Sequence, residues 1–83
     1  QTKRKESITM WKEGSIKVGS SIIHYWVKCF EEGSQYGIEK GRISKLMLKR
    51  DGEIIANYDR GWDIEPLDSD AEIVLAILMK EHN

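Results

Sequence analysis

GRISKLMLKRDGEIIANYDRGW, residues 41–62, is the stretch that decides the fold of this 83-residue chain. Asp51 and Gly52 separate two apolar runs, which is a strong local signal for a β-hairpin. A two-residue loop would pair Lys49 with Ile54 and mix charged and apolar side chains on both faces. A three-residue loop with Gly52 in the left-handed conformation separates them, so we expect the three-residue loop.

The three-residue loop divides the hairpin side chains between two faces. Lys49 would lie opposite Glu53, and Lys45 would lie opposite Asn57, on the polar face. The apolar face, which we predict to be the core, consists of Leu46, Leu48, Ile54, Ala56 and Tyr58.

The segments around the hairpin complete a sheet. Residues 21–31 form the longest strand candidate, and short strands are expected at residues 7–12 and 15–18. Residues 31–40 contain two glycines and predict a mobile loop, while residues 64–67 read as an extended linker. In the long strand the faces alternate, with Ile23, Tyr25, Val27 and Cys29 on one side and Ile22, His24, Trp26, Lys28 and Phe30 on the other. Large apolar groups on both sides are typical of a central strand.

The last element is a helix over residues 69–80. Ser69 and Glu72 have capping-box spacing, and Asp68 and Asp70 favour the positive end of the helix dipole. The expected apolar stripe is wide and comprises Ile73, Val74, Ile77 and Leu78, flanked by Leu75, Ala76 and Met79. We therefore predict an α+β fold: an antiparallel meander sheet of four to five strands with one C-terminal helix packed on one face.

Composition predicts one folded domain. Hydrophobic residues make up 40% of the chain and there is one proline, so we expect a single domain at residues 7–83 after a disordered basic arm at residues 1–6. No apolar run approaches the roughly 20 residues that a membrane-spanning helix needs. The lone Cys29 excludes an internal disulfide and favours a reducing compartment, so we expect a cytoplasmic protein.

Charge is unevenly distributed, although the net charge is −1. Residues 1–50 hold eleven basic and five acidic residues, whereas residues 51–83 hold two basic and nine acidic ones. In a fold of this size we expect the two halves to face each other, which indicates internal complementarity more than separate binding surfaces.

The chemistry of catalysis and metal binding is not visible in the sequence. His24 and Cys29 are an odd number of residues apart on one strand, so they point to opposite faces and cannot share a metal. Residues 68–72 alternate like the ligands of a calcium loop, but Ile73 stands where that loop needs glycine. We expect no catalytic residue, no cofactor and no metal site, and therefore a protein that is not an enzyme.

Aromatic residues are the best indication of a binding surface. A single helix covers one face of a sheet, so the other face would show Trp26 and Phe30 near Met47 and Ile55. Two further candidates are Arg60 and Trp62, which flank Gly61 and belong to residue types that are enriched at binding hot spots. The structural alternative is that Trp62 caps the core and Arg60 pairs with Asp59 or Asp63.

Two functions follow from these residues. We favour a small protein-interaction or adaptor module, with a protein partner or a second copy bound through Trp26, Phe30, Met47, Arg60 and Trp62. The alternative is a nucleic-acid-binding protein that holds single strands on Lys28, Lys45 and Lys49 beside Trp26. The acidic second half of the chain argues against the alternative, as do Glu31 and Glu53, which the predicted register places near these lysines.

A resemblance adds a setting. The run YWVKCFEEGSQYGIEKGRISKL, followed by KRDGEIIANYDRGWDIEP and an apolar C-terminal helix, resembles a family of small uncharacterised proteins. These proteins are carried by conjugative transposons and related mobile elements of Gram-positive bacteria. The similarity covers about residues 10–83. It implies a bacterial cytoplasmic accessory protein and assigns no activity or site residue.

Overall fold

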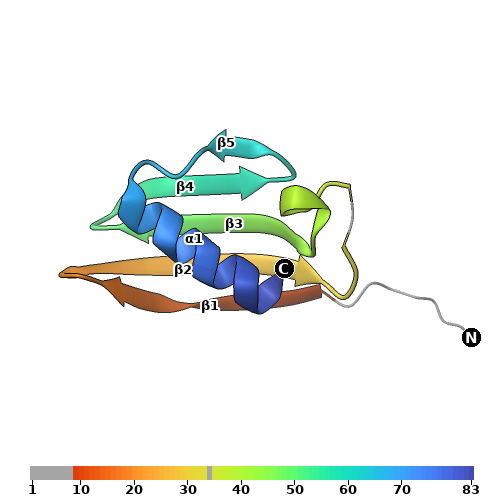
Figure 1. Cartoon of the computed structure of the whole chain (residues 1–83), viewed down its shortest axis with the longest axis horizontal. Coiled ribbons are helices and arrows are strands. Elements are labelled where there is room, and N and C mark those ends of the chain that lie inside the picture. Colours follow the sequence, from red (N-terminus) through yellow and green to blue (C-terminus); the bar gives the residue numbers. More distant parts are fainter. Residues whose placement is uncertain (1–8, 34) are drawn as a thin grey trace, which may run out of the picture.

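Five strands form one antiparallel sheet in sequence order, and one helix crosses a single face of it (Figure 1). The computed structural model describes residues 9–33 and 35–83, so the predicted basic arm lies outside the described residues. The elements are β1 Thr9–Val18, β2 Ser21–Phe30, the short 3-10 helix η1 Ile38–Lys40, β3 Ile43–Arg50, β4 Glu53–Asp59, β5 Trp62–Ile64 and α1 Ser69–His82. The predicted α+β fold is confirmed.

The hairpin between β3 and β4 turns through two residues, so the predicted three-residue loop is wrong. Asp51 and Gly52 both have positive φ, of 52° and 81°, as a type I′ turn requires. Arg50 lies opposite Glu53 directly across this turn. A turn of this type is favoured because its backbone twist matches the right-handed twist of the flanking strands.

A β-bulge in β4 restores the apolar face that this turn would otherwise disrupt. Lys49 lies opposite Ile54, but the next pair along is Leu48 opposite Ala56. Ile55 is the extra residue of the bulge, and it is fully buried in the core instead of lying on the opposite face. The separation of apolar and polar side chains, which we expected from a three-residue loop, is therefore produced by the bulge.

Beyond the bulge, the predicted core face is confirmed, but the predicted polar pairs are wrong. Ile54, which was also predicted on the core face, lies before the bulge, opposite Lys49 on the other face. Leu46 lies opposite Tyr58, and both are buried. Lys45 lies opposite Asp59 and not opposite Asn57. Glu53 is displaced from Lys49 by the shorter turn. The apolar partition survives because the predicted and observed registers here differ by two residues, which keeps every side chain on its face.

β1 is one continuous strand, so the two predicted short strands are wrong. It pairs with β2 along its whole length, and Gly14 lies opposite Tyr25. A Cβ atom at Gly14 would lie 2.9 Å from the Tyr25 hydroxyl oxygen. Glycine is therefore used here to admit a neighbouring ring and not to turn the chain.

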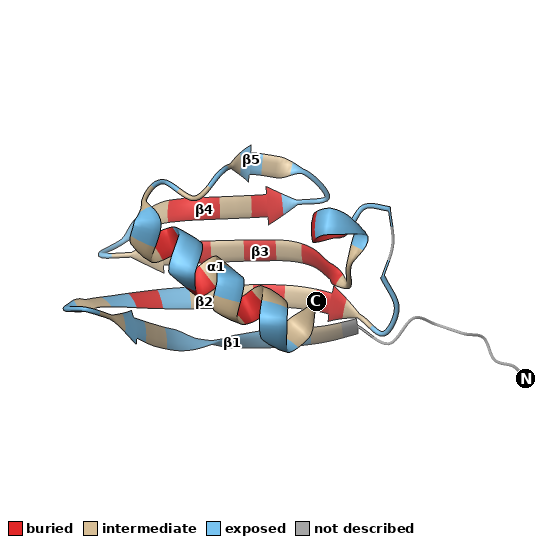
Figure 2. Ribbon diagram, viewed as in Figure 1, coloured by how far each residue is buried: buried red, intermediate tan, exposed pale blue. Residues whose placement is uncertain are grey.

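The core lies between α1 and the face of the sheet that carries alternate residues of β2, β3 and β4 (Figure 2). Its fully buried side chains include Ile23 and Val27 of β2 and Leu48 of β3. The predicted faces of β2 are confirmed. β1 and β5 form the two edges of the sheet, and β1 is largely exposed.

The helix begins at Ser69, as predicted, but its capping residue is one position earlier than expected. Asp68, not Ser69, is the N-cap, and its Oδ1 accepts a hydrogen bond of 3.0 Å from the Ala71 backbone N–H. The buried stripe of α1 consists of Ala71, Val74 and Leu78. Ile73, which the sequence analysis placed in the stripe, is 47% exposed.

The segment between β2 and β3, predicted as a mobile loop, is attached to the core. Ile38 of η1 is buried, and the Tyr58 hydroxyl donates a 2.8 Å hydrogen bond to the Tyr36 carbonyl oxygen. The Asn83 side chain accepts from Ile43 N–H at 2.9 Å and donates to the Ile38 carbonyl oxygen at 3.0 Å. The end of α1 is thereby joined to η1 and to the start of β3.

β5 occupies part of the predicted linker, and Trp62 lies opposite Tyr58 of β4. Among the residues that the structure describes, no helix combines the length and the apolar character that crossing a membrane requires.

Candidate functional site

The face of the sheet opposite α1 is covered by no helix or strand of the described chain, and we call it the open face. Its membership follows from the pairing register, because directly opposed residues share a face. The open face comprises Trp11, Glu13, Ser15 and Lys17 of β1, Ile22, His24, Trp26, Lys28 and Phe30 of β2, Lys45, Met47 and Lys49 of β3, Ile54, Asn57 and Asp59 of β4, and Ile64 of β5.

One row across the open face combines an aromatic ring with two lysines. Trp11, Lys28, Lys45 and Asp59 are successive cross-strand neighbours from β1 to β4. The Lys28 ammonium lies 5.7 Å from the centre of the Trp11 ring and 5.5 Å from that of Phe30. Lys45 Nζ lies 3.8 Å from an Asp59 carboxylate oxygen. Lys28 is thus held between two aromatic rings beside a second lysine.

The next row brings the second tryptophan beside a thioether and an amide. Trp26 lies between Glu13 of β1 and Met47 of β3, and Met47 lies opposite Asn57 of β4. The Asn57 amide donates a long hydrogen bond of 3.5 Å to Asp63. This row is apolar at its centre and polar at both ends.

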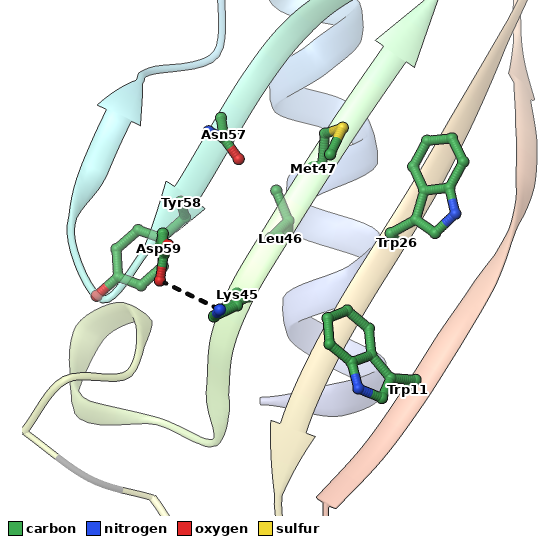
Figure 3. A pocket seen from close by; sticks show the side chains of 8 residues that line it. All are labelled: Trp11, Trp26, Lys45, Leu46, Met47, Asn57, Tyr58 and Asp59. Carbon is green, nitrogen blue, oxygen red and sulfur yellow. Dashed lines mark ion pairs between the residues drawn. The ribbon is translucent and has the colours of Figure 1, made fainter.

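A shallow hollow of about 190 Å³ lies where these two rows meet (Figure 3). Trp11 and Trp26 form its aromatic side, and Figure 3 shows the Trp11 ring lying over β2, the strand that carries Trp26. Asn57 and Asp59 form its polar side. Its remaining lining residues are Lys45, Leu46, Met47 and Tyr58.

The charge of the open face is opposite in sign to that of the whole protein. Lys17, Lys28 and Lys49 form no ion pair with any residue that the structure describes. The carboxylates at this face are Glu13, Asp59 and Asp63. Asp59 is paired with Lys45, and Asp63 accepts the hydrogen bond from Asn57. The open face therefore has an excess of positive charge, although the net charge of the chain is −1.

Glu53, which the sequence analysis placed beside these lysines, is not on the open face. It lies opposite Arg50, whose guanidinium donates a 2.6 Å hydrogen bond to Asp68 at the start of α1. Glu31 lies just beyond the end of β2. The register change thus removes one of the two carboxylates that were expected to repel a nucleic acid.

Six of the eight predicted site residues gather on one surface. They are the partner-binding candidates Trp26, Phe30 and Met47 and the nucleic-acid-binding candidates Lys28, Lys45 and Lys49. The other expected member of this surface, Ile55, is in the core.

Trp62 and Arg60 lie apart from the open face. The Trp62 ring packs against the core and meets Tyr58 edge-to-face, with ring centres 5.1 Å apart and planes at 78°. This is the core cap that the structural alternative described. Arg60 is exposed in the β4–β5 turn with φ of 60°, and its backbone N–H donates to the Ser44 carbonyl oxygen. It has no ion pair with the described carboxylates: Asp59 pairs with Lys45, and Asp63 accepts from Asn57.

Trp11 is the site residue that the sequence analysis missed. It is 61% exposed on the edge strand β1. The signal was present in the alternation of Trp11 with the half-buried Met10, Ile16 and Val18. That alternation was lost when Gly14 was interpreted as a break between two strands.

Metal-ligating residues do not gather on the part of the chain that the structure describes. No group of three histidine, cysteine, aspartate or glutamate side chains is arranged there to hold an ion. His24 lies on the open face and Cys29 is buried in the core, so the prediction that they point to opposite faces is confirmed.

Comparison with known proteins identifies a family for most of the chain. Residues 10–83, from β1 to the end of α1, match a family model described as Domain of unknown function (DUF7678). No curated protein and no solved structure matches the chain.

Proposed function

Since the chain belongs to the DUF7678 family, whose description names no reaction, we propose a binding function: the open face holds single-stranded nucleic acid. The observation that carries this proposal is the position of Lys28, between the Trp11 and Phe30 rings and directly opposite Lys45. An aromatic platform with interspersed cations is what single strands require, because bases stack on the rings and phosphates meet the ammonium groups.

The like charges of Lys28 and Lys45 support an anionic ligand. Identical charges directly opposite each other on two strands destabilise the pairing. Asp59 compensates Lys45 at 3.8 Å, whereas Lys28 meets only aromatic faces among the described residues. A phosphate group placed at Lys28 would supply the missing countercharge.

The spacing of the other lysines suits an extended backbone. Lys49 lies opposite His24 in the row beyond Trp26, and Lys17 lies opposite Ile22 one row farther. Rows on one face are two residues apart, which is about 6.8 Å along a strand. A strand of nucleic acid that follows β2 would therefore pass Lys28, Trp26 and the Lys49 row in turn.

Single strands fit this surface better than a duplex. Bases stack on Trp11 and Trp26 only if they are unpaired and turned toward the sheet. The element that would enter a major groove, α1, lies on the other side of the sheet, and its first turn carries Asp70 and Glu72. The distribution of charge thus directs phosphates to the open face.

The test is a titration of fluorescently labelled oligonucleotides, single-stranded and duplex, at low and moderate salt. We expect single strands to bind more tightly, and affinity to fall steeply with salt because phosphate contacts release counterions. Replacing Trp26 or Trp11 with alanine should weaken binding roughly tenfold, as expected for the loss of one stacked base. Lys28→Ala and Lys49→Ala should also weaken it.

Two matched controls separate the open face from general charge. Lys12 neighbours Trp11 in β1 but lies opposite the core residue Val27, so Lys12→Ala removes one charge from the other face. A variant with Lys3, Arg4 and Lys5 all changed to glutamine removes the basic N-terminal cluster. Absence of binding at low salt, or binding lost only with the N-terminal variant, would contradict the proposal.

A second candidate function, docking of a protein or of a second copy, is favoured by apolar side chains away from the open face. Ile73 on α1 is 47% exposed, so one flank of the helix is not covered by the sheet. Leu67, which precedes the helix, is 57% exposed. Sedimentation at high concentration tests this candidate. A wild-type dimer that dissociates on Ile73→Ser would support it, and a strict monomer would remove the self-association form.

The sequence resemblance supports a setting for either function. We propose a non-enzymatic bacterial accessory protein of the cytoplasm, carried by a mobile element of Gram-positive bacteria. A survey of the genes that flank its own gene tests this setting, because genes for transfer or integration should lie nearby.

A further inference from the structure

We propose that the hollow on the open face selects guanine among the bases of the bound strand. This inference rests on the proposed single-strand binding and names the base that it prefers. The inference is based on the residues that line the hollow. One side is aromatic and consists of Trp11 and Trp26, the other side is polar and consists of Asn57 and Asp59, and Met47 lies on the strand between them (Figure 3).

The aromatic side supplies a stacking surface but no selectivity, since every base has a π-face. Trp26 is half-buried and Trp11 is exposed. A base that stacks against these rings over Met47 directs its polar edge toward β4. The residues there, and Lys45 on β3 beside them, then decide which base edge is accepted.

The polar side combines a donor-only group with an acceptor-only group. The Lys45 ammonium donates hydrogen bonds and accepts none, whereas the Asp59 carboxylate accepts through two oxygens and donates none. The two groups are 3.8 Å apart and both are partly exposed, so a ligand can reach them together. The Watson–Crick edge of guanine is their complement: its O6 accepts, and its N1–H and N2–H donate side by side.

The other bases match this pair less well. Uracil and thymine place one donor between two acceptors, so one acceptor would face the carboxylate. Cytosine places one donor beside two acceptors and leaves the same conflict. Adenine offers one donor and one acceptor and uses a single oxygen of Asp59. The expected order is therefore guanine, then adenine, then the pyrimidines.

The lysines of the open face differ in whether they have a carboxylate partner, and this difference is consistent with the inference. Lys17, Lys28 and Lys49 have no carboxylate partner among the described residues and are available to phosphates. Lys45 forms an ion pair with Asp59, so its positive charge is already compensated. The ion pair therefore suits the uncharged edge of a base better than it suits a phosphate. Bidentate recognition of one base edge discriminates against other bases by roughly tenfold.

The test uses the full chain and an oligothymidine that carries one central guanosine, adenosine, cytidine or inosine. We expect the guanosine strand to bind roughly tenfold more tightly than the all-thymidine strand. Inosine lacks the N2 amine, so it should lose part of this gain. Asp59→Asn should abolish the preference for guanosine, because an amide presents one acceptor oxygen and one donor NH2 group where the carboxylate presents two acceptor oxygens side by side.

Glu13→Gln is the matched control. It removes one negative charge from the same face but not from the lining of the hollow, so it should preserve the preference. Equal affinity of wild type for all five strands, the all-thymidine strand included, would overturn the guanine inference while the proposed single-strand binding stands. The same holds if Asp59→Asn and Glu13→Gln act alike on every strand. Failure of every strand to bind would overturn both.

Discussion

At the scale of single residues, Asp68 links two parts of the fold. Its carboxylate accepts a 2.6 Å hydrogen bond from the Arg50 guanidinium at the end of β3. The same carboxylate caps α1 by accepting from the Ala71 N–H. The hydrogen bond from Arg50 and, after it, the one from Ala71 hold the pKa of Asp68 below its ordinary value.

This depressed pKa predicts a specific loss of stability in acid. A carboxyl whose pKa is lower in the folded state contributes stability above its unfolded pKa, about 3.9, and loses it as the pH falls through the folded value. Asp68→Asn keeps an N-cap acceptor but removes the charge. Thermal unfolding should therefore show wild type above Asp68→Asn at pH 7, with the difference shrinking toward pH 2.

The control for this prediction is Glu65→Gln, at an exposed position between β5 and α1. Its melting temperature should follow that of wild type at both pH values. A difference between wild type and Asp68→Asn that stays constant from pH 7 to pH 2 would contradict the linkage.

At the scale of elements, α1 is attached by a narrow stripe. Leu78 is fully buried against the sheet, whereas Ile73 is 47% exposed. Leu78→Ala should lower the free energy of unfolding by about 2–5 kcal/mol, because it removes buried methyl groups and leaves a cavity. Ile73→Ala should change it by less than about 0.5 kcal/mol, as exposed substitutions do. Denaturant unfolding measures the free energy of unfolding of both variants. An equal loss for Leu78→Ala and Ile73→Ala would show that the buried stripe of α1 does not run through Leu78.

The end of α1 is held by Asn83, whose amide joins β3 and η1 through two hydrogen bonds. Asn83→Ala should cost about 1–3 kcal/mol of unfolding free energy, because it leaves the Ile43 N–H and the Ile38 carbonyl without these partners. Glu81→Ala, in the same exposed turn, serves as the control. Gly41→Ala should also destabilise, since a Cβ atom there would overlap the Asn83 amide.

Hydrogen exchange offers a second measurement of the Asn83 contact. The Ile43 amide should exchange faster in Asn83→Ala than in wild type, and the amides of Leu46 and Leu48 should change less. Unaltered protection at Ile43 would show that the hydrogen bond from the helix end does not hold this strand.

At the scale of the whole molecule, the separation of charge predicts how binding responds to salt. Each phosphate contact with a single strand contributes roughly 0.7 to the slope of log affinity against log salt. Lys28→Ala should reduce this slope by about that amount. Trp11→Ala should lower affinity and leave the slope unchanged, because stacking releases no counterions. Titrations at four or more salt concentrations give both slopes, and a shallower slope for Trp11→Ala would contradict the assignment.

The candidate site could be predicted in part. Alternation along β2 and β3 placed Trp26, Lys28, Lys45 and Met47 on one side of the sheet, because the side-chain period of a strand is two residues. Trp11 was missed because Gly14 was interpreted as a turn, and Gly14 has the same appearance in the sequence whether it turns the chain or admits Tyr25. The hollow depends on which strands are neighbours, and alternation within one strand carries no such information.

The sequence by itself determined the elements and their faces. The α+β class, the β3–β4 hairpin and the C-terminal helix follow from local periodicity and from turn residues such as Asp51-Gly52, whose effects extend over a few neighbouring positions. Only the tertiary structure decided the register of the hairpin, the burial of Ile55 and the gathering of Trp11 with Asp59. Strand twist at the turn and packing under α1 compete over many residues at once, and the bulge at Ile55 is where both are satisfied.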